Sequence, residues 1–424
     1  MASVPQQSGA PTKGGWITFP FIITTMAGLT LSAGGWTNNL VVYLINEFNI
    51  KSIDATQITN IFKGCMNLFP ILGAIFADSY FGLVVFVFGK RYYRLLKPQG
   101  SPFTELARVA VAAFRKRKVL FSLNTEDYCQ GPHDGETKFV RSTPTNSFRF
   151  LNHAALVTQG DTSPDGSIKK PWNLCTLQQV EDLKTIIRII PLWTAGIFLF
   201  TPIAIQTSLI VLQALAMDRH LGPHFQIPAG SMLVFVMLST SIFLTLIDRV
   251  LIPMFQKLTG THPTPLQRIG IGHVLVILSM AISALVELKR LSIAQAHDLD
   301  GNLVVPMSAF WIAPQLVILG VAEAFYLPGQ VSLYYQEFPK ALKSTSSALV
   351  SMLVGIAFYL GTVVVDLISK ITGWLPDGIN DGRMDNMYWV LTVIVLINFG
   401  YYLVCSSLYK YQNVEKDVPS SDPC

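Results

Sequence analysis

One acidic residue stands alone in a long apolar stretch of the sequence. Glu323, in GVAEAFYLPGQ, follows Met307 by sixteen residues, and no other charged residue lies between them. A carboxylate inside a membrane span is unfavourable unless it is protonated or paired, and such residues often mark routes for ions and protons. The sequence therefore predicts that Glu323 lines a substrate route. The alternative is a structural carboxylate that is hydrogen-bonded to a neighbouring helix.

A lone cation occupies another apolar run. Lys63 interrupts the stretch from 55 to 77 and could attract an anion at the mouth of a cavity. The alternative is that its long stem carries the ammonium to the outer membrane interface. Eight residues from Ala55 correspond to about 12 Å at the helical rise of 1.5 Å per residue, which is within reach. Both interpretations stay open, and this short distance favours the second.

Two amides share one helical face in a third apolar run. Gln206 and Gln213 are seven residues apart, so they lie two turns from each other on the same side of a helix. Uncharged amides can hydrogen-bond a small anion, which would place both on the substrate route. Polar packing between helices is an equally good interpretation.

The remaining reactive side chains predict neither an enzyme nor a metal site. The five cysteines are scattered without paired spacing, and His153 and His273 have no cysteine or carboxylate at ligand spacing. The sequence also lacks a glycine-rich phosphate loop and a Ser/His/Asp arrangement. We therefore expect no catalytic residue, metal or cofactor, and no nucleic-acid partner.

The elements that carry these residues are membrane spans. Hydrophobic residues make up 51% of the 424 residues and charged residues 13%, against about 25% charged in soluble domains, and the mean hydropathy is +0.44. Apolar runs predict an all-α polytopic membrane protein with two spans before a polar region (90–184) and six after it. The predicted spans are 16–45, 55–77, 189–216, 231–247, 269–286, 307–330, 345–368 and 387–409.

Charge orients the spans. Between residues 90 and 118 there are nine Lys or Arg residues and one acid, Glu105, so the positive-inside rule places this polar region in the cytoplasm. We read the basic cluster as a topology determinant beside anionic lipid rather than a binding site. Even numbers of spans on each side then place both termini in the cytoplasm. The predicted parts are a two-span unit (1–82), a cytoplasmic linker (83–184), a six-helix bundle (185–412) and a cytoplasmic tail (413–424).

Two helices are expected in the linker. The stretch from Thr104 to Val119 has an amphipathic pattern with a basic face. TLQQVEDLKTIIR, from Thr176 to Arg188, reads as a helix that leads into the next span, with Thr176 as its N-cap.

Several motifs together resemble one family. GAIFADSYFG (73–82), FRFLNHAAL (148–156), TLQQVEDLKTIIRIIPLW (176–193) and GWLPDGINDGRMDNMYWVL (373–391) are similar to the plant nitrate/peptide transporter family. This family belongs to the proton-dependent oligopeptide transporters of the major facilitator superfamily. The opening FPFIITTMAGLT most resembles the nitrate excretion subgroup. The resemblance implies two six-helix halves around a central site, a small anion such as nitrate as substrate, and the plasma membrane as location.

Measured against the family, the N-terminal half is short. After the turn DSYFG (78–82) only Leu83 to Gly89 are apolar before Lys90 and Arg91, too few for a span. The following YYRLLKPQGSPF resembles the family's sequence after span six. The resemblance therefore implies that spans three to five and most of span six are absent, as in a splice form or an altered gene model.

The coupling motif of the family is also missing. Peptide-transporting relatives have ExxER in span one, and the matching positions here are Met26, Leu29 and Thr30. These side chains cannot hold the coupling proton, so we expect downhill anion efflux instead of proton symport. The alternative is a truncated form that does not transport and associates with full-length relatives. In either case we expect the missing spans to leave Glu323, Gln206 and Gln213 on an uncovered face.

Overall fold

The structure of the chain is a computed structural model. The structure describes residues 19–76, 102–119, 127–129, 144–158, 160–161, 168–301, 303–339 and 342–411. The predicted junction between Gly82 and Leu83 and the predicted C-terminal tail lie outside these residues.

Two long helices form the N-terminal part. α1 (Phe19–Phe48) and α2 (Ser52–Phe76) are joined by a short turn, and α2 lies along α10 (Lys343–Thr372). The approach of α2 to α10 is close because glycines meet at the contact. A Cβ on Gly355 would lie 3.0 Å from the carbonyl oxygen of Gly64. The N-terminal pair is thereby packed against the second half of the chain.

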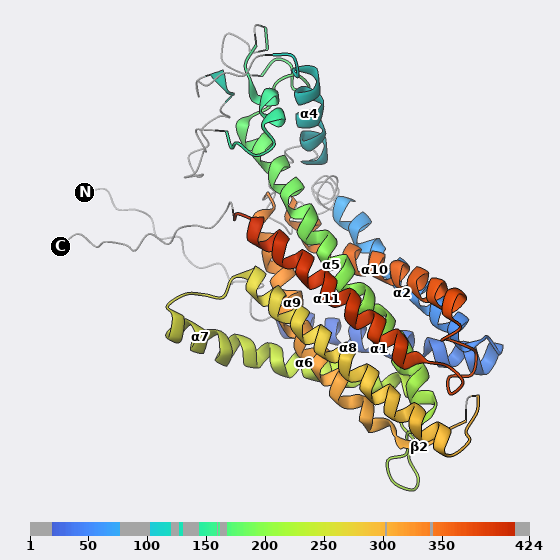
Figure 1. The fold of residues 1–424 in the computed structure, drawn as a ribbon. Helices are drawn as coiled ribbons and strands as arrows, with labels where there is room; N and C mark the ends of the chain where they lie inside the picture. The colour runs from blue at the N-terminus through green and yellow to red at the C-terminus, as the bar shows by residue number, and fades with distance from the viewer. Residues whose placement is uncertain are drawn as a thin grey trace.

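Six membrane-length segments follow the linker and form a bundle (Figure 1). The first is α5 (Leu177–Leu215). The second is broken into α6 (Val234–Leu246), a π-helical turn η6 (Ile247–Leu251) and α7 (Ile252–Thr259). The remaining helices are α8 (Pro265–Ala296), α9 (Ala313–Glu337), α10 and α11 (Met384–Leu408). Within the bundle α8 packs on α9 and α11, α6 packs on α9, and α10 packs on α5.

Membrane-spanning character is confirmed for most of the predicted spans. Seven helical segments of the described chain are long and apolar enough to cross a bilayer: α2, α5, α6–α7, α8, α9, α10 and α11. α1, the first predicted span, is a further helix of 30 residues. The chain is therefore an all-α multi-pass membrane protein. Its strands are limited, in the described part, to the parallel pair β1 (Met217–Asp218) and β2 (Val305–Ser308).

The linker forms a small unit at the N-terminal end of α5 (Figure 1). α4 (Pro102–Arg115) and the 3-10 helix η4 (Arg149–Ala155) pack against the first turns of α5 around Val109, Leu151 and Val180. α4 matches the predicted amphipathic helix, with bounds shifted by a few residues. Thr176 is the N-cap of α5, as predicted, and forms a capping box with Gln179.

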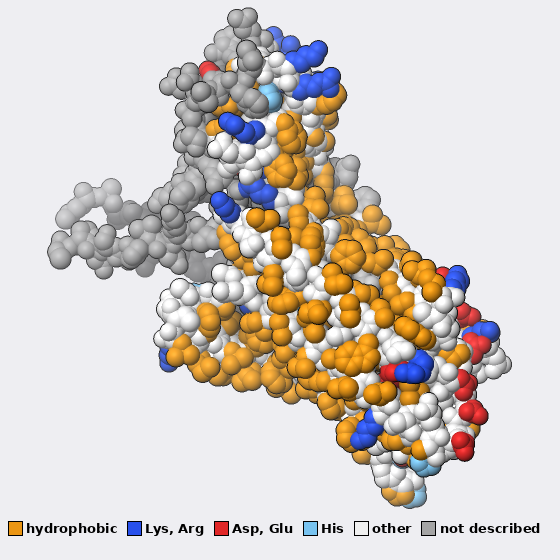
Figure 2. Space-filling model, viewed as in Figure 1, with side chains coloured by type: hydrophobic (Ala, Val, Ile, Leu, Met, Phe, Trp, Pro, Cys, Tyr) orange, Lys and Arg blue, Asp and Glu red, His pale blue; other side chains and the backbone are white. Residues whose placement is uncertain are grey.

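Hydrophobic side chains cover the surface of the bundle (Figure 2). Charged side chains gather on the linker unit and at the opposite end of the helices, so an apolar band separates two polar ends. Large exposed apolar side chains of the bundle helices include Leu258 (78% exposed), Ile397 (69%) and Leu367 (55%). Such exposure is unfavourable in water and favourable against acyl chains, in agreement with a membrane protein.

Candidate substrate route

Lys63 lies where three helices meet. It projects from α2, its ammonium is 3.5 Å from the Asn38 Oδ1 of α1, and it lies 5.8 Å from the centre of the Phe358 ring of α10. The amide contact is long for a hydrogen bond, and the ring offers only a weak cation–π contact. Among the described residues no carboxylate forms an ion pair with Lys63. The positive charge is thus half-buried, and part of its hydrogen-bonding capacity is free.

Glu323 lies at the contact of α9 with α6. The Thr240 hydroxyl is 3.2 Å from its Oε2, but the same hydroxyl is 2.8 Å from the Val236 carbonyl, so its single proton is shared. The two helices approach closely because Gly320 has no side chain: a Cβ there would lie 2.5 Å from the Val236 carbonyl. The structure records no cation beside Glu323 in the part of the chain that it describes. The structure therefore shows the interhelical hydrogen bond of the second interpretation, and a place for Glu323 on the substrate route stays a prediction.

Gln206 and Gln213 lie inside the bundle, and both are fully buried. Gln206 donates to Ser279 (3.0 Å) and Ser283 (2.7 Å) of α8, and Gln213 donates to Glu287 (2.7 Å) of the same helix. These contacts are polar packing between α5 and α8, the second of the two predicted interpretations. The expectation that the glutamines would lie on an uncovered face is wrong, because α8 covers both.

Gln213 contacts a buried ion pair that was not predicted from the sequence. Glu287 and Arg290 of α8 have no exposed side-chain surface, and their charged atoms are 2.7 Å apart. Arg290 also bonds Asn380 and the Ile379 carbonyl in the loop before α11. The predicted span ended at residue 286, whereas α8 continues to Ala296 and keeps both charges inside. Their spacing of three residues, which places them on one helical face, was the available signal.

The structure does not bring all predicted residues together. Lys63 contacts α1 and α10, whereas Glu323 contacts α6, and no contact recorded among the described residues joins them. Leu29 of α1 is 63% exposed, and the side chains of Met26 and Thr30 lie outside the described part. Asn38, Thr240 and Phe358 were not predicted from the sequence. Asn38 and Thr240, as polar residues within apolar runs, carried the signal that could have found them.

In the described part of the chain, no three His, Cys, Asp or Glu side chains come together as a metal-ligand set. His153 uses both ring nitrogens near the carbonyls of Phe150 and Val119, and His273 lies 2.9 Å from the Ile269 carbonyl. His153 thus joins η4 to the segment after α4, whereas His273 bonds within α8 and stacks on the Tyr402 ring of α11.

Known proteins share both the sequence and the fold of this chain. Protein NRT1/ PTR FAMILY 2.7 of Arabidopsis thaliana is 42% identical over 533 aligned positions, which cover 95% of this chain and 94% of that protein. Protein NRT1/ PTR FAMILY 2.6 of the same plant is also 42% identical, over 96% of this chain and 95% of its own length.

Solved structures agree on the fold. An autoinhibited POT family peptide transporter superposes with a TM-score of 0.59 at 14% identity, over 94% of this chain and 98% of that one. The POT family transporter PepTSo superposes with a TM-score of 0.57 at 14% identity, over 94% of this chain and all of that one. The sequence profile of the POT family matches residues 79–380. The chain therefore belongs to the POT family, a family of membrane transporters and not of enzymes.

Proposed function

We propose that this transporter, when the missing spans are present, carries nitrate or a similar small anion downhill, without obligatory proton coupling. The observation that carries this proposal is Lys63, a cation in a membrane helix that has no ion-pair partner among the described residues. A partly unsatisfied ammonium favours an anion in its neighbourhood. Met26, Leu29 and Thr30 support the absence of coupling, because none of them can hold a proton.

The proposed route runs between the α1–α2 pair and the bundle. In this proposal Lys63 on α2 and Glu323 on α9 both line the route. The free energy of an anion that moves outward falls by about 2.3 kcal/mol per 100 mV of a membrane potential that is negative inside, so the potential drives efflux. Gln206 and Gln213 contribute by fixing α5 on α8 rather than by binding the anion.

The proposed location is the plasma membrane, with the linker unit and both termini in the cytoplasm. The basic residues of the linker support this orientation by the positive-inside rule. In the described part, Arg108, Arg115 and Arg117 contact Trp172, Asn173 and Phe114 within the linker itself. Those contacts agree with a cytoplasmic unit that has its own packing.

We further propose that this chain lacks spans three to six and does not transport by itself. The alignment with NRT1/ PTR FAMILY 2.7 has 533 positions and the chain has 424 residues, so at least 109 positions (533 minus 424) have no counterpart in the chain. Alternating access needs two halves that close around a midplane site. A half reduced to α1 and α2 walls the route on one side only. The second candidate function is therefore association with a full-length relative that supplies the other wall.

The coupling proposal is tested in a chimera that restores the missing spans from NRT1/ PTR FAMILY 2.7. Nitrate efflux from proteoliposomes should persist when the pH gradient is collapsed at constant voltage. Lys63→Gln should slow it, whereas Lys370→Gln, which removes an exposed cation paired with Asp366, should not. Efflux that stops with the pH gradient would contradict downhill transport.

A further inference from the structure

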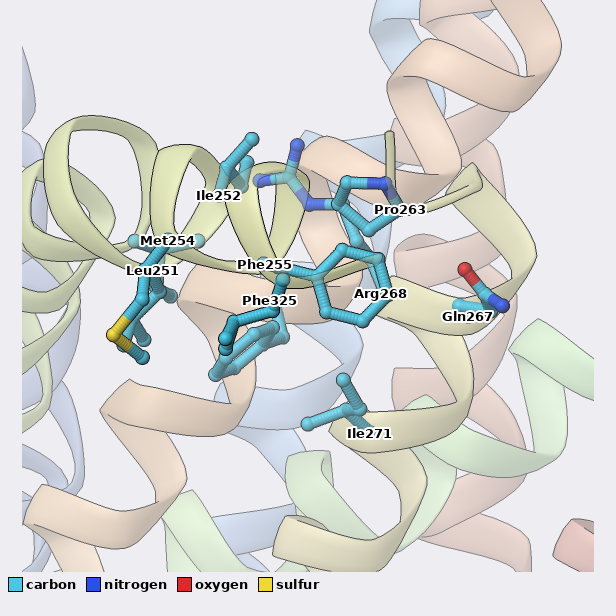
Figure 3. A pocket seen from close by; sticks show the side chains of 11 residues that line it. Leu251, Ile252, Met254, Phe255, Pro263, Gln267, Arg268, Ile271 and Phe325 are labelled. Atoms are coloured by element: carbon cyan, nitrogen blue, oxygen red, sulfur yellow. The ribbon is translucent and has the colours of Figure 1, made fainter. Parts of the chain in front are cut away.

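A pocket of about 490 Å³ lies between α7, α8 and α9, and neither Lys63 nor Glu323 is among the residues that line it (Figure 3). Its size is that of a small-molecule site, for which about 300–1,000 Å³ is usual. Nearly all of its lining is apolar, with Met254 and Phe255 from α7 and Phe325 from α9. The two polar residues in the lining are Gln267 and Arg268, from the first turn of α8.

The outer wall of the pocket is a helix that faces lipid. α7 buries none of its side chains, and Met254 and Leu258 are 52% and 78% exposed. α7 continues α6 after the π-helical turn η6, and Figure 1 shows it at the periphery of the bundle. On the opposite wall, Ile271 of α8 is 44% exposed. The pocket thus opens toward acyl chains.

Arg268 gives the pocket its charge. Its side chain is 16% exposed, and its buried Nε has no hydrogen-bond partner among the described residues. The ion pair with Asp248 is long, at 3.5 Å, and Asp248 is half-exposed, so it satisfies the guanidinium only in part. Arg249 and Lys257 are exposed on the same segment, and Asp248 is the single acid between residues 247 and 271. The rim is therefore net positive.

An apolar pocket with an unsatisfied guanidinium at its polar end matches an amphipathic anion. α7 ends and α8 begins at the same end of the bundle as the linker unit, which is where lipid headgroups of that leaflet lie. Basic pockets between membrane helices are known headgroup sites. We propose that this pocket binds an anionic phospholipid of the linker-side leaflet, with an acyl chain between α7 and α8–α9 and the phosphate on Arg268.

The test uses the full 424-residue chain in vesicles of phosphatidylcholine. Each vesicle preparation contains a trace of one photoreactive lipid, either phosphatidylglycerol or phosphatidylcholine. The two photoreactive lipids carry the same acyl chain and differ only in the headgroup. Labelled peptides are then mapped by mass spectrometry. Peptides from residues 252–271 should be labelled about tenfold more by phosphatidylglycerol, the factor expected for one charge-assisted hydrogen bond. Equal labelling by the two lipids would overturn the proposal.

Variants of the chain test separately how the headgroup and the acyl chain of the lipid contribute to binding. Arg268→Gln should abolish the preference for phosphatidylglycerol, and Lys370→Gln, a remote loss of one positive charge, should leave it unchanged. Ile271→Trp should fill the pocket and reduce labelling with both lipids. Arg268→Lys keeps the positive charge and should retain most of the preference for phosphatidylglycerol. It provides a second test if Arg268→Gln folds poorly. Equal effects of Arg268→Gln and Lys370→Gln would contradict a role for Arg268.

Competition with a soluble phosphate distinguishes a lipid site from a site for soluble anions. Glycerol phosphate in large excess should leave the labelling unchanged, because it offers the phosphate without the acyl chain. Displacement of the lipid by glycerol phosphate would identify a site for soluble anions and overturn the lipid assignment.

Discussion

Membrane-embedded charges of this protein divide into satisfied and unsatisfied ones. Glu287 has Arg290 and Gln213 as partners and is fully buried, so its charge is compensated at every oxygen. Glu323 has one shared hydroxyl, and Lys63 has one long amide contact. Unpaired charges in membrane spans are costly and are retained where function needs them, whereas a buried pair holds structure.

Two neutralising substitutions test this division in the chimera with restored spans. Glu323→Gln should alter nitrate flux and leave protein abundance unchanged. Glu287→Gln leaves a buried guanidinium without its carboxylate, at a cost of about 3–5 kcal/mol, and should lower abundance and the midpoint of thermal unfolding. Unchanged flux in Glu323→Gln would favour the structural interpretation of Glu323.

The sequence could predict Glu323 but not the Glu287–Arg290 pair. Glu323 is surrounded by apolar residues along the chain, so hydropathy alone reveals it. Glu287 and Arg290 stand where the apolar run ends, and hydropathy reads them as an exposed helix end. The partners that bury them, Gln213 and Asn380, come from distant segments that one-dimensional patterns do not bring together.

At the scale of elements, close helix packing fixes the N-terminal pair on the bundle. A Cβ on Gly64 of α2 would lie 2.9 Å from the Tyr359 ring of α10, whereas a Cβ on Gly73 of the same helix would meet nothing within 4 Å. The Gly64 position is therefore part of the α2–α10 contact, and Gly73 is not.

Alanine at these two glycines gives a matched comparison. Gly64→Ala should destabilise the protein by about 1–3 kcal/mol, the range for overpacking, and lower the midpoint of thermal unfolding in detergent. Gly73→Ala should be neutral or stabilising by up to about 1 kcal/mol, because alanine is the better helix former. Equal midpoints for the two variants would show that α2 does not pack on α10 in this way.

The linker unit depends on a buried ion pair. Lys116 and Asp161 are 2.7 Å apart, with 7% and 4% of their side chains exposed, and Lys116 also donates to the Leu156 carbonyl. Burial alone would raise the pKa of Asp161, but hydrogen bonds from Lys116 and Thr158 and the charge of Lys116 outweigh it and hold this pKa below its ordinary value. The resulting stability is complete above the unfolded pKa of about 3.9 and is lost as the pH falls through the folded value.

Lys116→Gln should therefore loosen the linker unit and make it more sensitive to acid. Without Lys116, burial dominates and raises the pKa of Asp161, so stability is lost at a higher pH. Hydrogen-exchange protection of residues 144–158, compared at neutral and mildly acidic pH, measures this loss of stability in the linker unit. Lys118→Gln removes an exposed lysine two residues away and should match the parent. Equal protection in the two variants would contradict a structural role for the Lys116–Asp161 pair.

Periodicity and composition predicted the elements well because a bilayer imposes a simple rule on length and hydropathy. The spans and the Thr176 cap follow from that rule and from local capping chemistry. The division of one span into α6, η6 and α7 was not predicted from the sequence. Pro253, in the first turn of α7, has no backbone N–H to donate and crowds the preceding turn, so it was the available signal for a break at IDRVL (247–251).

At the scale of the whole molecule, orientation is the first test. The proposed topology places the linker unit in the cytoplasm, and Gly160 lies in a turn of that unit. An epitope tag inserted beside Gly160 should bind antibody only after the plasma membrane is permeabilised. Binding in intact cells would reverse the orientation of every span.

The most direct measurement compares transport by this chain with transport by the chimera that restores the missing spans. Both are purified and reconstituted at equal protein per lipid, and nitrate flux per molecule is measured under an imposed voltage without a pH gradient. We expect flux in the chimera and none above empty vesicles for the 424-residue chain, because α1 and α2 wall only one side of the route. Comparable flux per molecule from the short chain would contradict it.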